Sequence, residues 1–154
     1  MIIFVDGSVT GNPGGVVGYG WHCPETGESS FGAAFQGGES STNNVAEWMG
    51  IVAALIFVLV KKPIAPIGTV TIKSDSELLV HQFNGEWRVK HSNLKPIAAI
   101  VNMMREELER VGVDVVAEWI PREQNKVADD LSRRAIKHQL KERRAMTLRE
   151  AGND

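Results

Sequence analysis

The sequence predicts a single α/β domain built on a mixed five-stranded sheet. Three strand-like segments follow one another with short connections, and two later ones alternate with helical segments. Short connections favour antiparallel neighbours, whereas helical crossovers favour parallel pairing. A chain of 154 residues is also long enough for one domain with its own core. We therefore expect three antiparallel strands and then two parallel ones, with helices flanking the sheet.

The first half of the chain contains three expected strands and one expected helix. Residues 2–8 and 16–24 are rich in strand-favouring residues, and a turn at 25–27 leads to a third strand at 28–36. Residues 41–62 contain many strong helix formers. Thr42 or Asn43 can cap the start of this helix, and lysines lie in its last turn.

The second half contains two expected strands and three expected helices. Residues 69–75 are β-branched and predict the fourth strand, and residues 113–121 predict the fifth. Helices are expected at 76–85 and 93–112, each ending in glycine, and at 125–144. We expect residues 146–154 to fray, so that the domain spans residues 1–145.

Composition and cysteine content favour a soluble cytoplasmic protein. Hydrophobic residues make up 43% and charged residues 23% of the chain, as in ordinary globular domains. The longest apolar run, residues 49–60, is too short to cross a bilayer of roughly 30 Å. No basic leader precedes the first strand, and Cys23 has no internal partner for a disulfide.

Charge is distributed unevenly along the chain. Residues 1–60 contain five acidic residues and no Lys or Arg, whereas residues 133–144 contain six Lys or Arg and one Glu. Such a basic segment indicates either a surface that binds polyanions or a solvated helix face, and charge alone does not decide between them.

Four carboxylates lie where a fold of this class would bring them together. Asp6 and Asp75 each end a predicted strand, and Glu47 and Asp129 lie near the starts of two predicted helices. If the two strands are adjacent and parallel, both acids open onto the same edge of the sheet. Four carboxylates that converge without a matching Lys or Arg would repel one another. An all-oxygen set of this kind suits Mg²⁺ or Mn²⁺.

Each acid also has a simpler interpretation. Asp6 precedes Gly7 and could stabilise a turn, and Asp75 could cap the helix that follows it. Glu47 could be an ordinary surface residue of its helix. Asp130 competes with Asp129, but adjacent residues of a helix point about 100° apart, so only one can face the site.

Four motifs together resemble the type 1 ribonuclease H family. They are DGSVTGNPG (6–14), TNNVAEWMGIVAAL (42–55), SDSELLVHQFNGEWRVKHSNL (74–94) and REQNKVADDLSRRA (122–135), in the order and at roughly the spacing of that family. The resemblance implies a ribonuclease-H-like fold. It also implies an endonuclease that cuts the RNA strand of RNA–DNA hybrids and leaves a 5′-phosphate and a 3′-hydroxyl.

The resemblance assigns roles to individual residues. The catalytic, metal-binding acids would be Asp6, Glu47, Asp75 and Asp129, which would hold two Mg²⁺, with Mn²⁺ as an alternative, and Asp129 rather than Asp130 matches the family pattern. Asn125 matches a position near the active site. The implied substrate-binding residues are Asn12, Asn43 and Asn44 in the minor groove of the hybrid, Thr42 and Asn93 at a DNA phosphate, and Trp87 on its sugar.

Trp87 could instead belong to the core, where we place Trp21, Trp48 and Trp119.

The sequence departs from the family in two places. Many members have a histidine in the loop before the last helix, whereas this loop contains only Arg122 and Glu123 as candidate substitutes. A basic insertion that grips the hybrid in some members is absent, which predicts weaker hybrid binding. We expect a monomer whose partner is the hybrid, with no obligate protein partner and no membrane.

Three other functions remain open at this point. They are a different nuclease on the same scaffold, such as a junction resolvase or integrase core, a nucleic-acid-binding module without catalysis, and a nucleotide-binding protein that uses the loop at residues 11–15. The Asn43–Asn44 pair argues against the first and the four acids against the second. The third lacks the lysine of a phosphate-binding loop.

Overall fold

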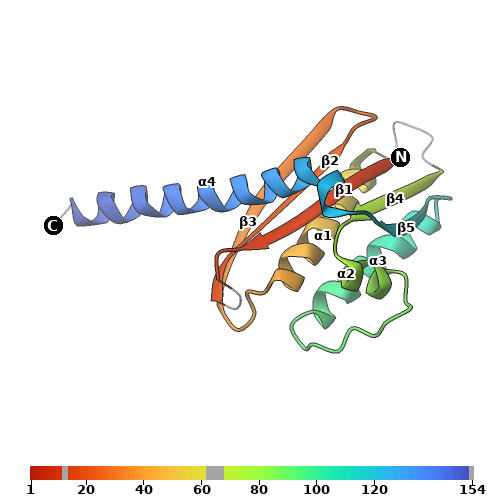
Figure 1. Cartoon of the computed structure of the whole chain (residues 1–154), viewed down its shortest axis with the longest axis horizontal. Coiled ribbons are helices and arrows are strands. Elements are labelled where there is room, and N and C mark those ends of the chain that lie inside the picture. Colours follow the sequence, from red (N-terminus) through yellow and green to blue (C-terminus); the bar gives the residue numbers. More distant parts are fainter. Residues whose placement is uncertain (12–13, 62–67, 153–154) are drawn as a thin grey trace.

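A computed structural model describes residues 1–11, 14–61 and 68–152 of the chain. One five-stranded sheet has the strand order β3-β2-β1-β4-β5 (Figure 1). Its strands are β1 (Ile2–Val9), β2 (Gly14–Cys23), β3 (Glu28–Gly38), β4 (Thr69–Ser74) and β5 (Asp114–Trp119). The first three are antiparallel, and β4 runs parallel to both β1 and β5. The predicted α/β fold with a mixed sheet is confirmed.

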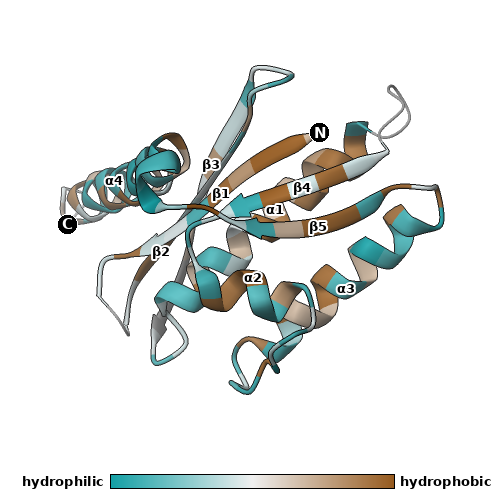
Figure 2. Ribbon diagram, turned by 45° about the vertical axis from the view of Figure 1, so that its right-hand side comes forward, coloured by the Kyte–Doolittle hydropathy of each residue, from teal (hydrophilic) through white to brown (hydrophobic). Residues whose placement is uncertain are grey.

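Four α-helices flank this sheet in the described part of the chain. They are α1 (Asn43–Lys61), α2 (Glu77–Phe83), α3 (Lys95–Glu109) and α4 (Lys126–Ala151), with one 3₁₀ turn at Arg122–Gln124 before α4. Helix α4 crosses β1, β2 and β3 on one side of the sheet, whereas α1 packs against β1 and β2 from the other side and also contacts α3 (Figures 1 and 2).

The core lies mainly between the sheet and α1. Ile51 and Leu55 of α1 and Ile3 and Ile72 of the central strands are fully buried. Figure 2 shows hydrophobic residues along β4 and β5, whereas α4 is largely hydrophilic on its outer side. By length and composition α1 would also suit a membrane span, but 56% of the relevant window is buried within the fold, as in a core helix.

Side chains cap two of the helices, one at the predicted residue and one at a neighbour of the residue considered. The hydroxyl of Thr42 accepts a hydrogen bond from the Val45 amide at 3.2 Å, so Thr42 caps α1. Ser76 caps α2 by accepting from the Leu79 amide at 3.3 Å. A capping role for Asp75 is therefore not needed, and its carboxylate remains available for other contacts.

The predicted end of the last helix is wrong. Helix α4 continues past Arg144 to Ala151 and projects beyond the sheet, where fraying from Met146 was expected (Figure 1). The extra residues include Met, Leu, Arg, Glu and Ala, which are strong helix formers. A helix that already packs on the sheet needs no new nucleation, so such residues can extend it.

Two of the three tryptophans assigned to the core lie there. Trp21 and Trp48 are buried, but Trp119 is 50% exposed and its assignment is wrong. Trp119 ends β5, the edge strand of the sheet, and its indole N–H donates to the backbone oxygen of Asp75 at 3.2 Å. An edge position leaves one side of the ring without a neighbour, which the apolar sequence around it does not reveal.

Candidate active site

Close approach of α1 to β1 positions Glu47. A Cβ atom at Gly7 would overlap the backbone of Ala46 and Glu47, so only glycine allows the first turns of α1 to lie against the strand. Gly50, one turn further along α1, lies against the backbone of Asp6, and a Cβ atom there would be 3.2 Å from the Asp6 backbone oxygen. The carboxylate of Glu47 is thereby held beside Asp6.

Glycines of β2 allow the first turns of α4 to lie close to the sheet. A Cβ atom at Gly18 would lie 2.5 Å from the Ser132 backbone oxygen, and one at Gly20 would lie 2.5 Å from the Cβ of Leu131. Gly20 pairs with Asp6 across the β1–β2 ladder, so Asp6 lies under the same turn of α4. The glycines of the two strands therefore bring both helices to Asp6, which lies within β1 and not, as predicted, at its end.

Three carboxylates form a compact cluster at this point. One oxygen each from Asp6, Glu47 and Asp75 lies within 4.8 Å of the others. The three residues come from β1, from α1 and from the turn after β4, and the parallel pairing of β1 and β4 brings the first and last of them together. Asp129 lines the same pocket, of about 250 Å³, but lies outside this cluster of three.

Burial and mutual repulsion make the carboxyl groups of Asp6 and Glu47 reluctant to ionise without a cation. Burial raises the pKa of Asp6 to about 7, and the charges of Asp75 and Asp129 add to the effect, whereas a hydrogen bond from Ser132 opposes it. Burial and then the charges of Asp6 and Asp75 raise the pKa of Glu47 well above its usual range. These shifts have the direction expected of a site that a cation would neutralise.

The donor set fits a hard divalent cation. The Oε2 atom of Glu47 is buried without a hydrogen-bond partner among the described residues. A buried carboxylate oxygen without a partner is costly, and coordination of a cation would remove that cost. Carboxylate oxygens are the ligands preferred by Mg²⁺ and Mn²⁺, so the residues present suit either ion.

Asp129 differs from the other acids because arginines pair with it. The Nε atom of Arg133 lies 3.2 Å and a terminal nitrogen of Arg122 lies 3.8 Å from Asp129 Oδ1. The expectation that the acids have no matching cation is therefore wrong for Asp129. Both arginine side chains are mostly exposed, so these ion pairs are weak. A divalent cation at Asp129 can therefore displace the arginines. Asp130 is exposed, as predicted.

Two buried polar residues hold the carboxylates in place. Asn125 donates from its Nδ2 atom to Asp75 Oδ1 at 3.0 Å and to the Val5 backbone oxygen at 2.9 Å, which agrees with its expected place near the site. Ser132, which lies in the motif at 122–135 but was given no role from the sequence, has its Oγ atom 2.8 Å from Asp6 Oδ2. Its spacing of three residues from Asp129 on one helix was the available signal.

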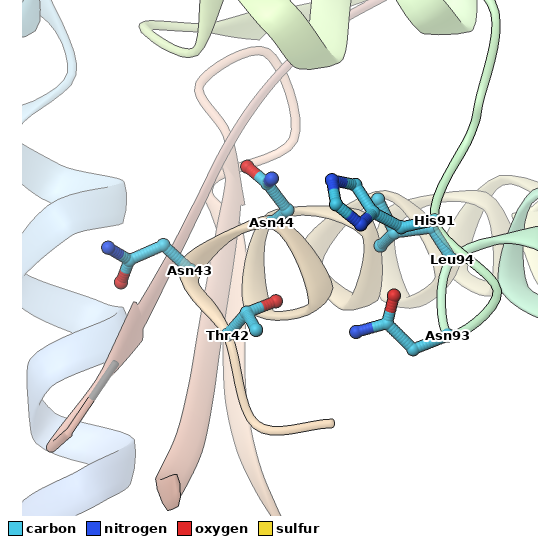
Figure 3. A pocket seen from close by; sticks show the side chains of 6 residues that line it. All are labelled: Thr42, Asn43, Asn44, His91, Asn93 and Leu94. Carbon is cyan, nitrogen blue, oxygen red and sulfur yellow. The ribbon is translucent and has the colours of Figure 1, made fainter. Parts of the chain in front are cut away.

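A polar pocket of about 300 Å³ lies beside the acidic one. Figure 3 shows Thr42 and Asn44 at the start of α1, with His91 and Asn93 across from them in the segment before α3. Asn43 points to the other side and also lines the acidic pocket, so the two pockets adjoin. Four predicted substrate-binding residues are thus gathered here: Thr42, Asn43, Asn44 and Asn93. Asn12 lies outside the described residues.

Trp87 lies on the surface and not in the core. It is 47% exposed, and its ring stacks on His81 with 4.3 Å between ring centroids. The pocket beside it, of about 470 Å³, contains the basic residues Arg88 and Lys90. His91 lines both this pocket and the polar one, so a polar and basic surface continues away from the acids.

The loop before α4 supplies Arg122 to the acidic pocket. Arg122 is among the residues that line it, whereas Glu123 is an exposed residue of the same 3₁₀ turn. Of the two residues proposed to stand in for a loop histidine, Arg122 has the more suitable position.

Comparison with known proteins adds independent information. The family model described as "Reverse transcriptase-like" matches residues 5–135. An uncharacterised protein, Mb2253c of Mycobacterium bovis, and the bifunctional protein Rv2228c of Mycobacterium tuberculosis are each 32% identical over 144 residues, covering 88% of this chain. The chain spans only 35% of the length of these curated relatives.

Two solved structures are similar over nearly their whole length. LC11-RNase H1 in complex with an RNA/DNA hybrid is 33% identical, with a TM-score of 0.76 over 90% of this chain and 98% of that one. The N-terminal RNase H domain of Rv2228c from Mycobacterium tuberculosis, fused to maltose binding protein, is 28% identical. Its TM-score is 0.73, over 92% of this chain and 96% of that one.

Proposed function

The chain belongs to the type 1 ribonuclease H family, and we propose that it is an endonuclease that hydrolyses the RNA strand of RNA–DNA hybrids. The main support is the cluster of Asp6, Glu47 and Asp75 beside the polar pocket of Thr42, Asn44 and Asn93. The similar LC11-RNase H1 was solved in complex with an RNA/DNA hybrid, and we extend that substrate to this chain.

The chemistry would depend on cations at the carboxylates. Two Mg²⁺ bound to Asp6, Glu47, Asp75 and Asp129 would supply the Lewis acidity that activates water and stabilises the leaving oxygen, giving 5′-phosphate and 3′-hydroxyl ends. Asn125 holds the carboxylate of Asp75 in a fixed orientation through its hydrogen bond. Arg122 and Arg133, which contact Asp129 and line the pocket, would bind the negatively charged phosphate.

Substrate recognition would use the neighbouring surface. The amides of Asn43 and Asn44 can both donate and accept hydrogen bonds, which suits contacts with 2′-hydroxyls and base edges in the minor groove. Thr42 and Asn93 would contact a phosphate of the DNA strand, and the exposed ring of Trp87 would pack on its sugar. A monomer in the cytoplasm is part of the same proposal.

A cleavage assay with a matched pair of variants tests the function. We expect the wild-type chain to cut a labelled RNA–DNA hybrid with Mg²⁺ or Mn²⁺ and to lose activity in EDTA. Asp75→Asn removes a carboxylate of the cluster and should lower the rate by at least about 100-fold. Asp130→Asn, an exposed acid next to Asp129, should cleave normally.

Three results would contradict the proposal. Full activity of Asp75→Asn would remove that residue from the site, and faster cutting of double-stranded DNA would replace the substrate. Tight hybrid binding without any cleavage would favour a binding module without catalysis.

A further inference from the structure

We propose that Ser132 is a positioning residue that holds the Asp6 carboxylate in the orientation required to bind a cation. The inference rests on the proposed function in assuming that Asp6 is a ligand. It concerns a residue of α4 that is fully buried and is not among the residues that line the acidic pocket.

The contact itself is short and shielded. Ser132 is fully buried, and its Oγ atom lies 2.8 Å from Asp6 Oδ2 and 2.9 Å from the Asp129 backbone oxygen. A hydroxyl has one hydrogen, so these two acceptors compete for it. An ionised carboxylate is the stronger acceptor, so the hydrogen is directed to Asp6 whenever that group is charged.

Packing alone does not account for a hydroxyl at this position. The other buried residues of α4 are Ala128, Leu131 and Ala135, and Ser132 is the one polar member of this set in the described helix. Alanine would satisfy the close approach of α4 to Gly18, because that approach involves the backbone oxygen of Ser132. The cost of burying this hydroxyl is offset by a hydrogen bond to Asp6 or to the Asp129 backbone oxygen, and the bond to Asp6 is the one that reaches the acidic cluster.

The hydrogen bond opposes a force that acts on Asp6. The charges of Asp75 and Asp129 both repel the Asp6 carboxylate, and rotation about its side-chain bonds would relieve this repulsion. Ser132 restrains Oδ2 of Asp6 from one side. Because Ser132 belongs to α4, its hydrogen bond to Asp6 also ties the start of α4 to β1.

The test is cation affinity measured without substrate. Mn²⁺ binding to Ser132→Ala, measured by isothermal titration calorimetry, should be about 10-fold or more weaker than to the wild-type chain, the usual size of effects from residues that orient metal ligands. Ser132→Thr keeps the hydroxyl and should recover affinity. Thr147→Ala is the matched control, since its hydroxyl also lies on α4 but bonds only the Arg143 backbone oxygen, at 3.1 Å.

Thermal unfolding in EDTA separates positioning from folding. We expect Ser132→Ala to unfold close to the wild-type temperature, and its kcat to fall with hybrid KM unchanged, because a fully buried residue cannot contact the substrate. If the alanine variant does not fold, Ser132→Cys keeps a similar volume with only a weak donor and should show the same loss of affinity.

Affinity of the folded variant within about 2-fold of wild type, well short of the expected 10-fold loss, would overturn the inference. Absence of Mn²⁺ binding by the wild-type chain would overturn it as well. A wild-type chain that binds Mn²⁺ without cutting the hybrid would instead overturn only the proposed function, and the affinity comparison would still decide the role of Ser132.

Discussion

Asp6 is buried among other carboxylates, so its ionised form destabilises the cation-free fold. Replacing this carboxylate with a neutral side chain should therefore stabilise the cation-free protein. Burial, with the charges of Asp75 and Asp129, raises the pKa of Asp6 from 3.8 to about 7. The folded state therefore binds this proton more tightly than the unfolded state does. The contribution of protonated Asp6 to the free energy of unfolding is fully present below pH 3.8. It declines as the pH rises toward 7 and is lost above 7.

The size of the effect follows from the two pKa values. At about 1.4 kcal/mol for each pH unit between them, ionised Asp6 destabilises the cation-free fold by about 4 kcal/mol. Asp6→Asn removes this charge and keeps a similar shape. We expect it to recover at least half of that free energy at pH 8, a rise in Tm of about 4–8 °C for a chain of this length.

Thermal unfolding in EDTA between pH 4 and pH 9 measures the effect. The quantity to plot is the Tm of Asp6→Asn minus the Tm of the wild-type chain, because the other titrating groups are common to both proteins. This difference should be small at pH 4 and should rise to a plateau above about pH 7. Asp130→Asn, at an exposed position, should show no such rise.

Mg²⁺ provides the complementary measurement. A cation that binds the folded state stabilises it by mass action, so Mg²⁺ should raise the Tm of the wild-type chain more than that of Asp6→Asn. A Tm difference independent of pH, or an asparagine variant less stable than wild type at pH 8 in EDTA, would refute the electrostatic reasoning.

Three further predictions concern packing and substrate binding. Gly18→Ala should lower the free energy of unfolding in urea by about 1–3 kcal/mol, because the new Cβ would lie 2.5 Å from a backbone oxygen of α4. Gly68→Ala is the control and should have little effect, because a Cβ atom there would have no neighbour within 4 Å. Equal stability of the two variants would contradict the close approach of α4. Trp87→Ala should raise KM for the hybrid about 5–100-fold with little change in kcat, as expected for loss of one stacking platform, and a purely catalytic defect would exclude this role. Replacing Lys137 and Lys141 of α4 with Gln should weaken the salt dependence of hybrid binding. The slope of log affinity against log salt concentration should fall in magnitude by about 1 for each of these residues that contacts a phosphate. An unchanged slope would mean that this face of α4 is only solvated.

Local patterns predicted most of the fold and the identity of the acids. The alternation of strand and helix formers placed every element within a few residues except the end of α4, and Thr42 caps α1 as its position suggests. The connections between segments predicted three antiparallel strands and then two parallel ones. The sequence left the adjacency of the strands of Asp6 and Asp75 open, and the parallel pairing of β1 with β4 in the structure explains why these two acids meet.

Other features depend on partners far away in the sequence. The exposure of Trp119 depends on the edge position of β5, and the hydrogen bond of Asn125 to Asp75 joins residues that are 50 positions apart. The sequence around Gly7 suggested a turn after Asp6, but the absent side chain of Gly7 makes room for α1.

The sequence by itself determined the fold class, the order of the elements and the acidic residues of the candidate site, because these depend on short-range preferences and on motifs of adjacent residues. Only the tertiary structure decided that Asp6 lies beneath Ser132 and that Glu47 has a buried oxygen without a partner among the described residues. Such contacts join residues as many as 126 positions apart, and their geometry exists only after the helices have packed on the sheet.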